Sequence, residues 1–173
     1  MPPHIRPATE QDLPAILGIM NEVIAHTLAI YAYAPVSLEE RQAWFAAQRA
    51  GGWPVLVAEL DGRVVGFGSI GVFRARPAYQ YSAEHSVHVH ADQRVLRVGG
   101  ALLKPLSKEA QRMALRTLSG WADSGNTGSL AFHARHGFVE CARITDVAWK
   151  FGHWLDLVFM QRILPGPKTP TER

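Results

Sequence analysis

The stretch VHVHADQRVLRVGGALL, residues 87–103, carries the most information about the fold. Its first residues alternate apolar and polar side chains, which is the period of a β-strand, and Leu102 and Leu103 begin a helical stripe. A loop rich in small and basic residues connects the two. The order strand, loop, helix N-terminus presents unpaired backbone N–H groups and so favours binding of an anion such as a phosphate. A plain strand–helix connection has a similar pattern.

Glycines and arginines in this connection strengthen the anion-site interpretation. Gly99 and Gly100 allow close approach of the backbone, and Arg94 and Arg97 add positive charge. The spacing is neither GxGxxG nor GxxxxGK[ST], which excludes a dinucleotide-binding fingerprint and a P-loop.

The hydrophobic spacing on either side predicts a mixed α/β order of elements, β-α-α-β-β-β-α-β-α-β-β. The Asp61-Gly62 turn joins two antiparallel strands, and Pro105 predicts a kink or a late start in the third helix. The expected helices cover residues 9–24, 37–51, 102–113 and 127–135. The expected strands cover residues 4–8, 54–60, 63–73, 84–90, 117–122, 138–149 and 154–163.

Composition narrows the class of protein. The chain has 173 residues, which indicates one domain, residues 1–164, before a polar, proline-rich tail, residues 165–173. The net charge of +3 is modest and its basic residues are scattered, so we expect no nucleic-acid partner. No apolar run reaches the roughly 18 residues of a membrane span, so we expect a cytoplasmic protein without membrane contact. The single cysteine, Cys141, excludes an intramolecular disulfide and is expected to be buried.

Several motifs resemble one acetyltransferase family over nearly the whole chain. Arg94-Val95-Leu96-Arg97-Val98-Gly99 stands where GNAT-superfamily acetyltransferases carry Arg/Gln-x-x-Gly-x-Gly/Ala. The segments Glu84-His85-Ser86-Val87 and Phe151-Gly152-His153-Trp154-Leu155-Asp156-Leu157 are similar to the phosphinothricin/methionine sulfoximine branch. The resemblance implies a single GNAT-type domain: a central mixed, mostly antiparallel sheet flanked by helices, with a splayed strand pair for acetyl-CoA.

The sequence departs from the family pattern at the pyrophosphate loop. Val95 and Arg97 replace the first two glycines of the family's Arg-Gly-x-Gly-x-Gly, and such glycines serve positive φ or close approach. Either Arg97 adopts the required conformation with some strain, or the loop moves aside and the site is impaired. Trp121 also stands where the family has a small aliphatic residue.

The resemblance implies a binding mode for acetyl-CoA. Backbone groups of the strand at residues 87–89 would pair with the pantetheine, the loop would hold the pyrophosphate, and Asn126 would bind the pantetheine arm. The implied cofactor-binding residues are Val87, His88, Val89, Arg94, Val95, Leu96, Arg97, Val98, Gly99, Gly100, Asn126 and Ser129. Asn126 has an alternative role as a helix N-cap.

The resemblance also implies the reacting groups. Glu84 would act as general base on the acceptor amine, directly or through a water, and His133 would donate a proton to the departing thiolate. Arg74 or Arg76 would bind the carboxylate of the acceptor. Glu84 could instead pair with one of these arginines at a strand edge, and His133 could be a packing residue.

The implied activity is transfer of an acetyl group from acetyl-CoA to the α-amine of a small amino-acid-like acceptor, by a homodimer. Phosphinothricin, methionine sulfoximine and methionine sulfone are the acceptors of the branch. The alternatives are a GNAT enzyme with another small amine acceptor and a degenerate CoA-binding protein with weak activity. His88-x-His90 has zinc-ligand spacing, but no third strong ligand is evident, so no metal is expected.

Overall fold

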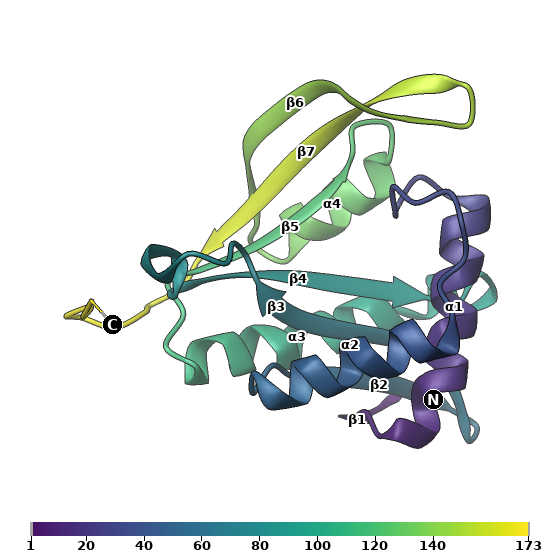
Figure 1. The fold of residues 1–173 in the computed structure, drawn as a ribbon, viewed down its shortest axis with the longest axis horizontal. Coiled ribbons are helices and arrows are strands. Elements are labelled where there is room, and N and C mark those ends of the chain that lie inside the picture. The colour runs from purple at the N-terminus through teal and green to yellow at the C-terminus, as the bar shows by residue number, and fades with distance from the viewer. Residues whose placement is uncertain (1, 173) are drawn as a thin grey trace.

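A seven-stranded sheet forms the centre of the molecule, with strand order β1-β2-β3-β4-β5-β7-β6 (Figure 1). The computed structural model describes residues 2–172, apart from the side chains of residues 94–96. The strands are β1 (His4–Pro7), β2 (Val55–Leu60), β3 (Arg63–Val72), β4 (Ser82–Val89), β5 (Thr117–Asp123), β6 (Val139–Lys150) and β7 (His153–Ile163). Only β4 and β5 pair in parallel, and every other neighbouring pair is antiparallel. The predicted mixed, mostly antiparallel sheet is confirmed.

Helices cover both faces of this sheet. In Figure 1, α1 (Leu13–His26) and α2 (Leu38–Ala50) lie on one face, and α3 (Val98–Arg112) lies on the other. The fourth helix, α4 (Thr127–Arg135), follows β5. The short 3₁₀ turns are η1 (Glu10–Asp12), η2 (Pro77–Tyr79) and η3 (Ala91–Leu96). Each face has its own apolar core, one between α3 and the sheet and one beneath α1 and α2. None of the described helices is long and apolar enough to cross a membrane.

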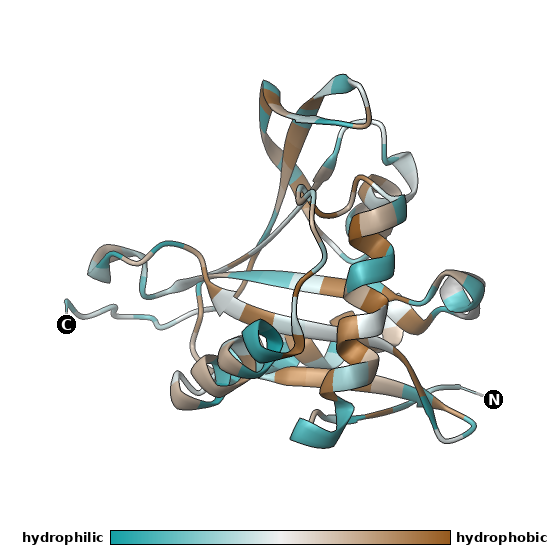
Figure 2. Cartoon of the chain, turned by 45° about the vertical axis from the view of Figure 1, so that its right-hand side comes forward, coloured by the Kyte–Doolittle hydropathy of each residue, from teal (hydrophilic) through white to brown (hydrophobic). Residues whose placement is uncertain are grey.

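The helix signals in the sequence act as expected at α2. The Ser37 hydroxyl accepts a hydrogen bond from the backbone N–H of Glu40, and the Glu40 carboxylate accepts one from the N–H of Ser37. These two bonds satisfy N–H groups that a helix start leaves free. In Figure 2, hydrophobic and hydrophilic residues alternate along α1, the pattern of a helix with one buried face.

Three local expectations are wrong. The third helix starts at Val98 and contains Pro105, so Pro105 does not delay its start. A proline in a helix removes one backbone hydrogen bond, and the buried leucines on both sides of it favour continuation. The loop expected at residues 93–100 instead contains the end of the 3₁₀ turn η3 and the first residues of α3. Cys141 is exposed, because β6 is an edge strand whose side chains are mostly exposed.

Candidate active site

The site is built where β4 and β5 separate. The two strands pair only from Ser82 to Glu84 on β4, with Thr117 to Ser119 on β5. Beyond Glu84, β4 stays paired with β3 up to Val89, and β5 stays paired with β7 up to Asp123. Each strand therefore keeps one neighbouring strand, and along residues 85–89 β4 pairs with β3 and no longer with β5. The edge of β4 that faces away from β3 can hydrogen-bond an extended, amide-containing ligand.

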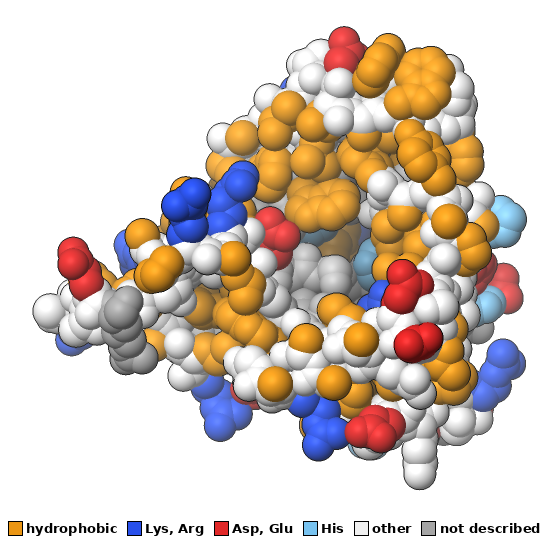
Figure 3. All heavy atoms as spheres, viewed as in Figure 1, with side chains coloured by type: hydrophobic (Ala, Val, Ile, Leu, Met, Phe, Trp, Pro, Cys, Tyr) orange, Lys and Arg blue, Asp and Glu red, His pale blue; other side chains and the backbone are white. Residues whose placement is uncertain are grey.

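A cavity of about 350 Å³ lies at this separation. Figure 3 shows a hollow below the β6–β7 hairpin, with apolar side chains above it and charged side chains on either side. Glu84 is the only lining residue of the Asp, Glu, Lys and Arg types among the described residues. Residues from α1, α2, β3, β4, β5 and α4 line the cavity, including Met20, Trp44, Gln48, Ser69, Glu84, Trp121 and His133.

Glu84 has the electrostatics expected of a general base. Its side chain is half-buried, and burial raises the pKa of its carboxyl group above the usual 4.5. The positive charge of Arg74 and hydrogen bonding from Trp121 oppose this increase. No ion pair within 4.0 Å joins Glu84 to Arg74 or Arg76 in the part of the chain that the structure describes, and the alternative that Glu84 pairs with one of these arginines stays a prediction. A raised pKa brings the carboxyl closer to the range in which general bases work best.

His133 enters the cavity from α4 with a fixed tautomer. Its Nδ1 lies 2.8 Å from the carbonyl oxygen of Ser129, which can only accept a hydrogen bond. Nδ1 therefore carries the proton, and Nε2 of the neutral ring is an acceptor. Burial lowers the pKa of His133 below its usual 6.5, so the neutral form prevails at pH 7. Its burial also agrees with the packing role left open by the sequence.

A second histidine and a glycine complete this side of the cavity. The rings of His85 and His133 lie 5.1 Å apart, and burial lowers the pKa of His85 to about 3. A methyl group at Gly120 would lie only 2.5 Å from Nε2 of His85 and 2.6 Å from Nε2 of His133. Position 120 therefore requires glycine. In the described part of the chain, no cluster of three or more His, Cys, Asp or Glu residues could hold a metal ion.

The anion-site connection contains an unusual backbone conformation. Arg97 has φ 58° and ψ 19°, the left-handed region that glycine adopts most easily, and it is the residue immediately before α3. This conformation is the one required by the first of the two outcomes considered from the sequence, and retention of acetyl-CoA binding stays a prediction. The predicted ligands Arg94, Val95 and Leu96 have side chains outside the described residues. Val98, Gly99 and Gly100 form the first turn of α3, whose N–H groups have no partner within the helix.

Some of the other predicted residues line the cavity and some do not. Val87, His88, Asn126 and Ser129 line the cavity, whereas Val89, Arg74 and Arg76 do not. Both arginines are exposed on the segment between β3 and β4.

Asn126 caps α4, because its side-chain oxygen accepts a hydrogen bond from the N–H of Ser129. This confirms the N-cap alternative for Asn126, and its contact with the donor stays a prediction.

Several site residues were missed by the sequence patterns. Met20 and Trp44 line the cavity, but their helical spacing is the same as that of core residues. Lys150 is buried and donates three hydrogen bonds, to the carbonyl oxygens of Ile24, Thr27 and Ile30, at 2.7, 2.9 and 2.8 Å. It thereby holds the segment after α1, part of which lines the cavity.

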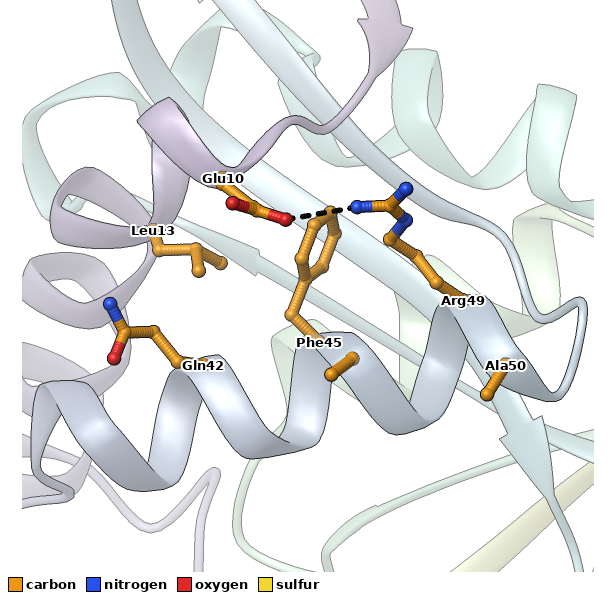
Figure 4. A pocket seen from close by; sticks show the side chains of 7 residues that line it. Glu10, Leu13, Gln42, Phe45, Arg49 and Ala50 are labelled. Atoms are coloured by element: carbon orange, nitrogen blue, oxygen red, sulfur yellow. Dashed lines mark hydrogen bonds and ion pairs between the residues drawn. The ribbon is translucent and has the colours of Figure 1, made fainter.

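A second groove, of about 590 Å³, lies between η1 and α2 (Figure 4). The exposed side chains of Glu10 and Arg49 cross it as an ion pair of 3.0 Å. Its two charged groups are thus already paired with each other, and Phe45 and Leu13 form its apolar floor. The separation of β4 and β5 is therefore the better candidate site.

Comparisons with known proteins agree with this geometry. Residues 20–138 match the Acetyltransferase (GNAT) family. The chain is 41% identical over 162 residues to the L-methionine sulfoximine/L-methionine sulfone acetyltransferase of Pseudomonas aeruginosa, covering 93% of this chain and 94% of that protein. It is 37% identical over 166 residues to the phosphinothricin N-acetyltransferase of Alcaligenes faecalis, with 95% and 84% covered.

A solved structure extends the comparison to the acetyl donor. The fold is similar to that of a GNAT superfamily phosphinothricin acetyltransferase from Sinorhizobium meliloti in complex with acetyl-CoA. The TM-score is 0.95 at 31% identity, and the match covers 99% of this chain and 95% of that one. The resemblance stated from the sequence motifs is confirmed: the chain belongs to the GNAT acetyltransferase family and is an acetyl-CoA-dependent N-acetyltransferase.

Proposed function

We propose that the enzyme acetylates the α-amine of a small, glutamate-like amino acid of the methionine sulfoximine, methionine sulfone or phosphinothricin type. The half-buried Glu84 carboxylate, at the point where β4 leaves β5, is the observation that supports this most directly. The names of the relatives from Pseudomonas aeruginosa and Alcaligenes faecalis support the acceptor class. The cavity volume of about 350 Å³ is of the order expected for a small ligand.

The acetyl donor fits the edge of β4 that faces away from β3 and the start of α3. Backbone groups of Val87, His88 and Val89 would pair with the pantetheine amides, and Asn126 and Ser129, which line the cavity, would contact the pantetheine arm. The N–H groups from Arg94 to Gly100 would surround the pyrophosphate, with the guanidinium group of Arg97 as a further partner. A phosphate group at this position also gains from the dipole of α3.

Glu84 would prepare the nucleophile. Its carboxylate accepts a proton from the acceptor's ammonium group, and the neutral amine then attacks the thioester carbonyl carbon. A β4 N–H would stabilise the oxyanion that forms. Arg74 or Arg76, on the segment before β4, would bind the acceptor carboxylate, and the charge of Arg74 already reaches Glu84.

His133 would carry the second proton. Because its Nε2 is an acceptor in the neutral ring, it first takes a proton from the ammonium nitrogen of the tetrahedral intermediate. The C–S bond then breaks, and the imidazolium gives this proton to the departing thiolate. His133 is neutral again at the end of the cycle.

The assembly and location also remain proposals. The β6–β7 hairpin exposes large apolar side chains, including Trp149, Phe151 and Trp154, and β6 is an edge strand. Exposed apolar surface of this kind is typical of protein interfaces, and we propose a homodimer through this hairpin. The cytoplasmic location expected from the sequence stays a prediction.

A panel of acceptors tests the proposal. We expect acetylation of methionine sulfone, methionine sulfoximine and phosphinothricin, with kcat/KM rising with pH through a pKa above 4.5, because Glu84 must be deprotonated. Glu84→Gln is expected to lower kcat by about 10²-fold without changing the Kd of acetyl-CoA. Glu109→Gln, on the surface of α3, is the matched control.

The outcomes separate the alternatives. Activity only with other amines would favour the GNAT enzyme with a different acceptor. Tight acetyl-CoA binding without turnover of any amine would favour the degenerate binder. Full activity of the Glu84→Gln variant would reduce Glu84 to a structural carboxylate.

A further inference from the structure

Arg41 on α2 is a buried cation without a carboxylate partner. Its side chain is 6% exposed, and no ion pair to it occurs among the described residues. The guanidinium carbon lies 4.4 Å from the ring centroid of Trp44, one terminal nitrogen faces the sulfur of Met20, and Nε has no hydrogen-bond partner. A buried guanidinium remains charged, and leaving it unpaired is costly. Such a group has unused capacity to bind oxygen atoms.

The cavity lies directly beyond the two residues that contact Arg41. Met20 and Trp44 both line it, so one layer of side chains separates the guanidinium from the cavity. No lysine or arginine among the described residues lines the cavity itself. A thioether is a weak hydrogen-bond acceptor on a flexible side chain, so Met20 can give way to a ligand oxygen.

The position along α2 places Arg41 away from the reacting centre. Gln48 donates a hydrogen bond to the carbonyl oxygen of Ile70, next to Gly71, and Gly71 is the β3 partner of Glu84. Arg41 precedes Gln48 by seven residues, about 10 Å along a helix axis. Its guanidinium carbon lies 4.4 Å from the ring centroid of Trp44, a residue that is about one turn closer to Gln48 along α2.

A glutamate-like acceptor has oxygen atoms at both ends. Its carboxylate lies next to the amine and therefore near Glu84 and Arg74. Its phosphinate, sulfone or sulfoximine group lies at the far end of the side chain, three bonds of about 1.5 Å from the α-carbon. A guanidinium suits these distal oxygens, and the aliphatic part of the group would contact Met20 and Trp44.

We propose that Arg41 is a specificity-determining residue that binds the distal oxygen atoms of the acceptor, with Met20 moving aside. The proposal rests on the acceptor class proposed above. Methionine, which lacks these oxygens, leaves the guanidinium unpaired and is therefore a poorer acceptor. A site built around a hydrogen-bonding group discriminates strongly against analogues that cannot use it.

Steady-state kinetics with methionine sulfone, phosphinothricin and methionine test this role. We expect the wild type to prefer both oxygenated acceptors over methionine. Arg41→Met is expected to lower kcat/KM for these two by at least tenfold and to change that for methionine less than threefold. The Kd of acetyl-CoA stays unchanged. Arg49→Met, on the exposed side of the same helix, is the control and is expected to keep the full preference.

Arg41→Gln is the second variant, because it retains much of the side chain over Trp44 while removing the charge. It is expected to lose the same preference, and melting temperatures establish that each variant is folded. Equal loss for methionine and methionine sulfone, or no loss for either, would overturn the assignment of Arg41. A wild type without any preference for oxygenated acceptors would instead contradict the proposed acceptor class.

Discussion

Arg97 offers a direct test of how the anion site is built without its usual glycine. The residue has φ 58° and ψ 19° immediately before α3. If this conformation is present before the ligand binds, a glycine at position 97 relieves strain without changing the shape of the site. If binding instead requires the loop to rearrange, glycine makes that rearrangement easier and tightens binding.

The magnitude follows from the backbone conformation. A left-handed conformation costs a residue with a Cβ about 1–2 kcal/mol. Glycine avoids that cost but loses about 0.5–1 kcal/mol through its greater freedom in the unfolded chain. Arg97→Gly and Arg97→Ala both remove the guanidinium, so their difference isolates the backbone. We expect the glycine variant to have the larger free energy of unfolding, by about 0.5–1 kcal/mol.

Urea unfolding and calorimetric titration with acetyl-CoA provide the measurements. Lys104, exposed in the interior of α3, is the matched control position. There the order is expected to reverse, with Lys104→Gly less stable than Lys104→Ala by about 1 kcal/mol. We expect Arg97→Gly to bind acetyl-CoA within tenfold of the wild type. Binding at least tenfold tighter, or Arg97→Gly less stable than Arg97→Ala, would refute the preformed site.

Three further predictions concern groups around the site and the first strand. Gly120→Ala is expected to lower the free energy of unfolding by about 1–3 kcal/mol and to reduce activity, because its methyl group would meet His85 and His133. Gly18→Ala is the control: position 18 has open space around it, so alanine is expected to stabilise α1. Lys150→Met is expected to lower the free energy of unfolding in urea by about 2–4 kcal/mol and to raise the acceptor KM, because carbonyl groups lose their hydrogen-bond donor. Lys108→Met, at an exposed position, is the control and is expected to change neither the unfolding free energy nor the KM. Arg6 lowers the pKa of Asp12 from its ordinary 3.8 to about 2, so this pair stabilises the fold by about 2 kcal/mol above pH 5, and this stabilisation is lost as the pH falls toward 2. The unfolding free energy of Asp12→Asn, measured over the same pH range, is expected not to show this decrease.

The order of helices and strands was predictable because it depends on local patterns. Capping at Ser37, the Asp61-Gly62 turn and the alternation along β4 each act over a few residues, and all three are present in the structure. The place of β7 between β5 and β6 depends on contacts between distant segments. No local pattern carries that information.

The candidate site was predictable only where it uses recognisable motifs. Glu84 and His133 were identified through the family resemblance, and both line the cavity. Arg41 has the spacing of an ordinary residue on a surface helix, and its burial depends on how α2 packs beside α1. Lys150 is likewise indistinguishable from a solvent-exposed strand residue until β6 is placed against the end of α1. Burial of a charged side chain is a property of the tertiary structure.

The opening between β4 and β5 is part of the fold. On one face of β5, the rings of Trp121 and Tyr31 lie 5.8 Å apart, and on the other His85 and His133 pack together beside Gly120. These side chains flank the place where the two strands cease to pair. The β4 edge is therefore available before acetyl-CoA arrives, and its binding need not break strand pairing. A ligand that supplies the missing hydrogen bonds binds the folded state alone, so we expect acetyl-CoA to raise the melting temperature in proportion to the logarithm of its concentration above Kd.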